Sequence, residues 1–267
     1  MSQQKSVTSK DGTPIAYWHS GQGPPLVLVH GTAADHGRCA PVLPTFEQHF
    51  SVCAVDRRGR GASGDSEDYA IEREFEDIAA VVDSLGEPPI LLGHSYGALC
   101  ALEAVLLTRN VRKSVLYEPG IEMAGQELYS PSDIERLEAL LGAGDRERVV
   151  ATFMREVAGL PPETVEHMRS QPPGKCWYPR RTPSRGNCER ARLTWLDAER
   201  FEALGVPTLV LSGGESPAAL RKAAEAIKET LSDSRIVVMA GHGHMAMDTG
   251  TELFTTEVLR FVEAPSS

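Results

Sequence analysis

The 267-residue sequence contains no apolar run close to the roughly 20 residues that a membrane-spanning helix needs. Its five cysteines are widely spread and none belongs to a C-x-x-C pair, so neither a zinc site nor a disulfide framework is indicated. Basic residues are in the minority, 27 Lys and Arg against 37 Asp and Glu, and the formal net charge of −10 repels nucleic acid and anionic membranes. We therefore expect a small-molecule substrate, no nucleic-acid or membrane partner, no metal and no cofactor.

The first residues, Met1 to Lys5, are polar and lead into further polar sequence rather than into the apolar stretch of a secretory signal. This start predicts a cytoplasmic protein. The sequence leaves open whether that protein is a monomer or a homodimer.

Short, nearly continuous apolar runs alternate with helical patterns along most of the chain. Such runs are typical of parallel strands that are buried on both faces of a sheet. The predicted strands are 26–29, 52–55, 90–92, 111–117, 208–211 and 235–239, preceded by a hairpin of 6–9 and 15–19. The predicted helices of this part are 70–85, 98–107, 217–230 and 251–262. The pattern predicts an open, mostly parallel α/β sheet, whose ligands bind beyond the carboxyl ends of the strands.

Four of these strand ends carry distinctive loops. Gly93-His94-Ser95-Tyr96-Gly97 lies between a strand and a helix, and its glycines allow a sharp turn that exposes the Ser95 side chain. The other loops are His30-Gly31-Thr32, Asp56-Arg57-Arg58-Gly59-Arg60-Gly61 and Gly241-His242-Gly243-His244. In this order the four motifs are highly specific, and from about residue 11 to about residue 262 the chain resembles the α/β-hydrolase family.

The resemblance implies a mostly parallel eight-stranded sheet with helices on both faces and a helical cap insertion. The core would comprise residues 1–120 and 201–267, and the cap would comprise residues 121–200. It also implies that Ser95 is the nucleophile and His244 the base, with His242 as the competing histidine. The N–H groups of Thr32 and Tyr96 would form the oxyanion hole.

The third member of the catalytic triad departs from the commonest family pattern. Ser216 occupies the position where many relatives have an aspartate, and a serine cannot stabilise an imidazolium by charge. Two carboxylates could replace it. Glu118 directly follows the strand at 111–117, a position that resembles the acid of some branches of the family, whereas Glu215 is adjacent to Ser216 but should point to the opposite side. We favour Glu118, and an incomplete triad is the third alternative.

Two further segments are charged. In the loop at 56–61 the resemblance favours a structural role, with Asp56 paired to an arginine under the site. Residues 169–192 of the expected cap hold a basic cluster with a single acid, Glu189. Three interpretations are ranked from first to last: a solvated loop, a segment encoded in a locally shifted reading frame relative to similar proteins, and an anion-recruiting lid. The basic residues are Arg169, Lys175, Arg180, Arg181, Arg185, Arg190 and Arg192.

The residues thus predict a serine hydrolase that cleaves an ester, thioester, lactone or related acyl bond through an acyl-enzyme on Ser95. A serine nucleophile disfavours the alkyl-enzyme mechanisms of dehalogenases and epoxide hydrolases. The alternatives are a cofactor-free perhydrolase or haloperoxidase-like enzyme, and a non-catalytic small-molecule binding protein of the same fold.

Overall fold

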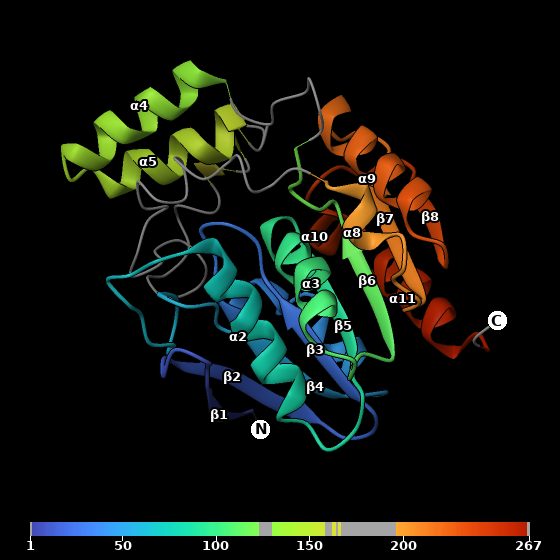
Figure 1. Cartoon of the computed structure of the whole chain (residues 1–267). Helices are drawn as coiled ribbons and strands as arrows, with labels where there is room; N and C mark the ends of the chain where they lie inside the picture. The colour runs from blue at the N-terminus through green and yellow to red at the C-terminus, as the bar shows by residue number, and fades with distance from the viewer. Residues whose placement is uncertain (1, 123–129, 158–161, 164, 167–195, 266–267) are drawn as a thin grey trace.

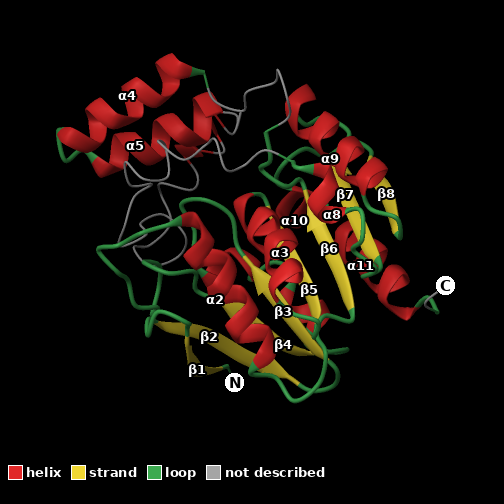
Figure 2. Ribbon diagram, viewed as in Figure 1, coloured by secondary structure: helices red, strands yellow, loops and turns green. Residues whose placement is uncertain are grey.

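The computed structural model describes residues 2–122, 130–157, 162–163, 165–166 and 196–265. One mixed sheet forms the centre of this part of the chain (Figures 1 and 2). Its strands are β1 (Gln3–Thr8), β2 (Pro14–Gly21), β3 (Pro25–Val29), β4 (Ser51–Val55), β5 (Ile90–His94), β6 (Lys113–Tyr117), β7 (Thr208–Gly213) and β8 (Ser234–Met239).

The strand order is β1-β2-β4-β3-β5-β6-β7-β8, with the first two pairings antiparallel and the rest parallel. The N-terminal hairpin and the eight-stranded, mostly parallel sheet are therefore confirmed. Because β3, β5, β6, β7 and β8 run in the same direction, the loops that leave them meet at one edge of the sheet.

Helices cover both faces of the sheet, as expected. One face packs against α2 (Ile71–Asp83), α3 (Tyr96–Leu107), α8 (Ala198–Phe201) and α9 (Ala218–Thr230). The other face packs against α1 (Leu43–Phe46), α10 (Ala246–Thr249) and α11 (Thr251–Glu263), with the 3₁₀ turn η1 (His36–Cys39) beside them. Figure 1 shows α2 and α3 on the near side of the sheet.

The apolar runs of the strands follow from this two-sided cover. Val27 and Val29 face the cluster that includes α2 and α3, whereas Leu26 and Leu28 face the cluster that includes α1 and α11. Successive side chains of a strand point to opposite faces, so a strand buried on both faces has no polar position to alternate with. Cys53 and Cys100 are buried in these layers as small apolar side chains.

Two helices stand apart from these layers, beyond the edge where the parallel strands end (Figure 1). They are α4 (Pro131–Gly142) and α5 (Arg146–Thr152), and α5 continues into the π-helical turn η2 (Phe153–Val157). Ser130 caps α4 by accepting from the Asp133 N–H, and the Asp133 side chain accepts in return from the Ser130 N–H. Both helices fall in the segment that the sequence assigns to a cap.

The junction of β5 and α3 leaves no room for side chains on its glycines. A Cβ at Gly97 would lie 2.3 Å from the Val29 carbonyl oxygen, and a Cβ at Gly93 would lie 2.4 Å from the Gly97 carbonyl oxygen. Both contacts are with backbone, which cannot rotate away as a side chain can. The start of α3 therefore packs directly on β3, and this contact fixes the turn between β5 and α3.

We expect Gly97→Ala to lower the free energy of unfolding by at least about 3 kcal/mol, because overpacking against backbone forces β3 and α3 apart. Gly86→Ala is the matched control, since a Cβ there meets no atom within 4 Å, and it should change stability by less than about 0.5 kcal/mol. Urea unfolding of both variants measures the difference. Equal stabilities would show that the junction is not tightly packed.

Candidate active site

Ser95 occupies a strained turn between β5 and α3. Its φ of 56° and ψ of −124° lie outside the regions that L-residues ordinarily adopt. Its N–H donates to the Tyr117 carbonyl at 2.9 Å, and its own carbonyl accepts from Ala98 and Gly120. These bonds to β6, to the loop after it and to α3 hold the backbone in this conformation.

The strain at Ser95 is shared with two neighbouring loops. Ala33 and Glu118 have φ values of 54° and 45°, and with Ser95 they are the non-glycine residues of positive φ in the described ranges. Ala33 follows β3, and Glu118 follows β6. Such backbone persists only where the surrounding structure over-determines it, and it concentrates at functional sites.

The Glu118 carboxylate binds the His244 ring. Nδ1 of His244 donates to Oε2 of Glu118 at 2.6 Å, and Oε1 of Glu118 accepts from the Gly213 N–H at 2.7 Å. The Glu118 side chain is fully buried, whereas that of His244 is 11% exposed. A proton on Nδ1 leaves the lone pair on Nε2, which is the arrangement that a general base needs.

The loop that carries His244 is fixed by side chains from β5 and β6. Tyr117 donates its hydroxyl proton to the Gly243 carbonyl and accepts from the Ala246 N–H at 2.9 Å. His94 donates from Nε2 to the His244 carbonyl at 3.0 Å, and its ring lies 4.7 Å from the His244 ring. The histidine loop therefore lies against His94, the neighbour of Ser95 in the chain.

Burial governs the protonation of the His94 and Tyr117 side chains. It lowers the pKa of His94 well below that of free imidazole, and the nearby His244 and Arg38 act in the same direction. His94 is therefore neutral and carries its proton on Nε2, where the His244 carbonyl accepts it. Burial, with the charge of Glu118, raises the pKa of Tyr117, so its hydroxyl keeps the proton that it donates to Gly243.

The loop after β3 approaches Ser95 closely. A Cβ at Gly31 would lie 3.0 Å from Cβ of Ser95 and 3.5 Å from its Oγ. Tyr96 is the first residue of α3 and directly follows Ser95. Among the described residues, neither the Thr32 N–H nor the Tyr96 N–H has a backbone or side-chain acceptor. Both backbone donors are thus free to bind a ligand atom.

The other candidates for the triad acid and base make different contacts. Glu215 is exposed, and its N–H donates to the His242 carbonyl. The His242 ring bonds Oγ1 of Thr249 at 3.0 Å and covers Gly250, whose Cβ position would lie 2.6 Å from the ring. Ser216 is buried, and its hydroxyl has no partner within the described ranges. The structure brings Glu118, and neither Glu215 nor Ser216, to His244.

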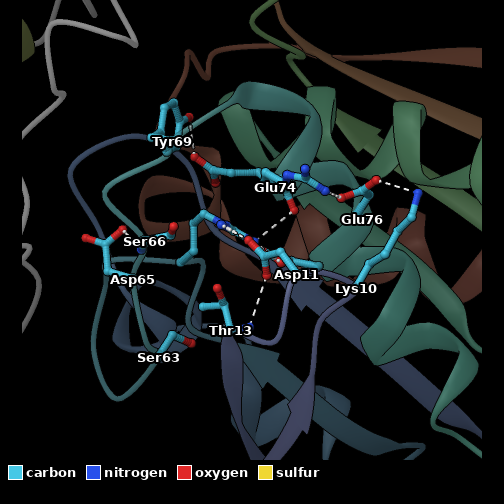
Figure 3. Close-up of polar contacts among 12 residues, drawn as sticks. Lys10, Asp11, Thr13, Ser63, Asp65, Ser66, Tyr69, Glu74 and Glu76 are labelled. Carbon is cyan, nitrogen blue, oxygen red and sulfur yellow. Dashed lines mark hydrogen bonds and ion pairs between the residues drawn. The ribbon is translucent and has the colours of Figure 1, made fainter.

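The expected pairing of Asp56 with an arginine is wrong. Asp56 accepts from Nδ1 of His36 at 2.7 Å and from the Trp18 indole at 3.1 Å. Two of the arginines bind acids of neighbouring segments instead. Arg57 pairs with Glu74 on α2, and Arg58 forms a two-pronged pair with Asp77 on α2 and a third contact with Asp11. The loop is a braced structural element, as expected, but with different partners. Figure 3 shows the surroundings of Asp11 in this network.

Sequence reasoning missed several residues that shape the site. Tyr117 and His94 hold the histidine loop, and their positions at the ends of β6 and β5 were the available signal. Arg38 gave no such signal: it lies on η1 and binds Asp248 on α10 at 2.7 Å.

Part of α5 and η2 packs directly over the loops of the site. Val150, Ala151 and Met154 form a small apolar cluster with Ala33, and Met245 packs against it. Ala33 follows Thr32 in the chain, and Met245 follows His244. The wall above the site is therefore apolar.

The remaining predictions concern the basic segment, metal binding and membrane-spanning helices. The basic segment 169–192 lies outside the described residues. In the described ranges, no group of three or more His, Cys, Asp or Glu side chains is placed to hold a metal ion. No helix there combines the length and the apolar character needed to cross a bilayer.

Comparison with known proteins decides the family. Residues 26–256 match the model of the alpha/beta hydrolase family. The chain belongs to the alpha/beta hydrolase family. An alpha/beta hydrolase from Sphaerobacter thermophilus is 34% identical over 94% of this chain and 100% of that one, with a TM-score of 0.77. The esterase RhEst1 from Rhodococcus is 25% identical over 98% and 99% of the two chains, with a TM-score of 0.76.

A curated relative of this alpha/beta hydrolase matches only locally. The probable oxidoreductase EphD of Mycobacterium tuberculosis is 36% identical over 100 residues, which is 35% of this chain and 17% of that protein. The chain thus matches about a sixth of the length of this relative.

We expect Tyr117→Phe in this alpha/beta hydrolase to lower the free energy of unfolding by about 1–3 kcal/mol, because the Gly243 carbonyl and the Ala246 N–H lose a buried partner. The aromatic ring, which stacks on His94, is retained. Hydrogen exchange should speed up in the peptide that contains His244 and stay unchanged in α2. Unchanged protection of that peptide would contradict the role given to Tyr117.

Proposed function

We propose that the chain is a serine hydrolase that cleaves an ester, thioester or lactone of a small molecule, with Ser95, His244 and Glu118 as its catalytic triad. The observation that carries this proposal is the 2.6 Å bond from Nδ1 of His244 to the buried Glu118, beside a strained Ser95 turn. The likeness to the Rhodococcus esterase supports an ester substrate.

In the proposed reaction, Ser95 Oγ attacks the acyl carbon as Nε2 of His244 takes its proton. The carbonyl oxygen becomes an oxyanion, which accepts from the N–H groups of Thr32 and Tyr96. Collapse breaks the bond to the leaving group, which receives the proton from His244. A water then attacks the acyl carbon as His244 takes a proton from it. The bond to Ser95 Oγ breaks, Oγ regains the proton from His244, and the free acid is released.

Glu118 has two roles in this scheme. Its carboxylate fixes the tautomer and orientation of His244, and it stabilises the imidazolium that forms in each half-reaction. The Gly213 N–H holds the second oxygen, so the carboxylate cannot rotate without losing a buried bond. Backbone donors at Thr32 and Tyr96 need no reorganisation as charge develops.

We further propose that residues 121–200 form a cap over the core of residues 1–120 and 201–267. The apolar wall of Val150, Ala151 and Met154 over Ala33 supports this division. A wall of this kind excludes water and favours a substrate whose group beside the scissile bond is apolar.

Reaction with a fluorophosphonate, read by intact mass, tests the nucleophile. The wild type should gain one phosphonyl group, whereas Ser95→Ala should gain none and should lose about 10⁵–10⁶-fold in kcat on a p-nitrophenyl ester. Matching circular dichroism spectra of the two proteins are the control for folding. A folded wild type that neither labels nor turns over would favour the small-molecule binding protein instead.

Replacement of each carboxylate tests the acid. Glu118→Gln should lower kcat by about 10²–10⁴-fold, because an amide can direct its N–H₂ at Nδ1 and stabilise the wrong tautomer of His244. Glu215→Gln, at an exposed carboxylate on the neighbouring loop, is the matched control and should leave kcat within about twofold. The reverse pattern would assign the acid to Glu215.

A further inference from the structure

The carbonyl of Gly31 accepts two side-chain hydrogen bonds. Nδ1 of His30 donates to it at 2.8 Å, and Nη2 of Arg57 donates to it at 3.3 Å. This carbonyl and the Thr32 N–H belong to the same peptide unit. Hydrogen bonds to a peptide oxygen polarise the whole unit and strengthen its N–H as a donor.

We infer that Arg57 is a positioning residue that orients and polarises the oxyanion hole, through the Gly31–Thr32 peptide on one side and the Tyr96 side chain on the other. This inference rests on the proposed serine hydrolase activity. It adds a residue outside the triad that acts when negative charge develops on the substrate oxygen.

Contacts of the guanidinium with both halves of the oxyanion hole support this role. Besides its bond to Gly31, its central carbon lies 4.5 Å from the centre of the Tyr96 ring. Tyr96 supplies the other N–H of the hole. The Arg57 side chain is 2% exposed, so water does not screen either contact.

A buried network of polar side chains holds the Arg57 guanidinium. Its Nη1 lies 3.1 Å from Oε2 of Glu74, which is 1% exposed on α2. The Tyr69 hydroxyl donates to Oε1 of Glu74 at 2.7 Å and lies 3.2 Å from the Tyr96 hydroxyl. Figure 3 shows Tyr69 directed at Glu74. The guanidinium is therefore held by its ion pair with Glu74 and by its contact with the face of the Tyr96 ring.

The backbone of Arg57 also sets the tautomer of His30. Its N–H donates to Nε2 of His30 at 3.2 Å, which leaves the ring proton on Nδ1 for the Gly31 carbonyl. Burial, and then the charge of Arg57, lowers the pKa of His30 well below its usual value. His30 therefore stays neutral, and the positive charge next to the peptide is that of Arg57.

Arg57 stays protonated in this position. Burial alone disfavours a charged guanidinium, but Glu74 and the neighbouring phenols and thiol raise the pKa of Arg57 above its ordinary value. Arg60, 3% exposed, adds a second guanidinium close by and donates to the Arg58 carbonyl at 3.1 Å. The charge of Arg57 thus lies buried beside the Gly31–Thr32 peptide, where it favours negative charge on an oxygen that accepts from the Thr32 N–H.

A transition-state analogue reports on this field directly. Phenyl trifluoromethyl ketone, labelled with ¹³C at its carbonyl, should add Ser95 Oγ to form a hemiketal, and its ¹³C shift follows ionisation of the hemiketal oxygen. In Arg57→Gln/Glu74→Gln, which removes both charges of the buried pair, the oxygen should ionise at higher pH than in the wild type. We also expect kcat to fall about 3- to 30-fold, less than for loss of an oxyanion donor, with KM within about twofold.

The matched control is Arg58→Gln/Asp77→Asn, which removes the adjacent buried pair of the same loop and helix. The bonds of Arg58 go to Asp77, Asp11 and the Arg73 carbonyl rather than to the oxyanion loop. This variant should lose stability but keep the hemiketal titration of the wild type. If the double variant does not fold, Arg57→Lys takes its place in the test. The lysine retains the charge beside Glu74 but lacks the forked guanidinium that reaches Gly31.

The outcomes separate this inference from the proposed function. A wild type that forms no hemiketal and takes no fluorophosphonate would overturn the hydrolase itself. A wild type that forms the hemiketal, with the same titration and kcat in both Arg57 variants, would overturn only the role of Arg57. A shift in each Arg57 variant that folds, and none in the Arg58 control, would establish it.

Discussion

The hydrogen bond between Glu118 and His244 is the interaction on which the arrangement of the site depends. A carboxylate with no exposed surface costs free energy unless its oxygens are bonded, and here each oxygen has one donor. One donor is Gly213 at the end of β7, and the other is His244 in the loop after β8. A single side chain from the end of β6 thus joins three strand ends, and it can do so because parallel strands bring their carboxyl ends to one edge.

The backbone is strained in the loops that meet at this edge of the sheet. Ala33, Ser95 and Glu118 are each held at positive φ, in the loops after β3, β5 and β6. Each lies next to or within a group that the proposed reaction uses. Closely packed backbone holds the Ser95 turn, since neither Gly93 nor Gly97 can accept a Cβ. The stability of the sheet therefore maintains local conformations that each residue would not adopt alone.

The sequence predicted the sheet well because burial on both faces leaves an unambiguous apolar run at each parallel strand. The family resemblance favoured Glu118 over Glu215 and over an incomplete triad, and the bond from His244 to Glu118 agrees with that choice. Pairings within the charged loop could not be predicted. Asp56 binds His36, and Arg57 and Arg58 bind Glu74 and Asp77, and the choice among so many charges depends on how α2 docks. For residues 121–200 the resemblance predicted helices but not the residues that they contact, because the contacts with Ala33 and Met245 join segments far apart in sequence.

The pairing of the two adjacent arginines explains how one loop can contribute to stability and also contact the proposed oxyanion hole. Glu74 and Asp77 are three residues apart on α2, so they lie on the same face of the helix. Arg58 donates two hydrogen bonds to the Asp77 carboxylate and so ties the loop to the helix. Arg57 shares Glu74 with Tyr69, which leaves one amino group of its fork for the Gly31 carbonyl. Because α2 also packs against α3, the same helix positions both the helix that begins after Ser95 and the guanidinium that contacts the Gly31 carbonyl.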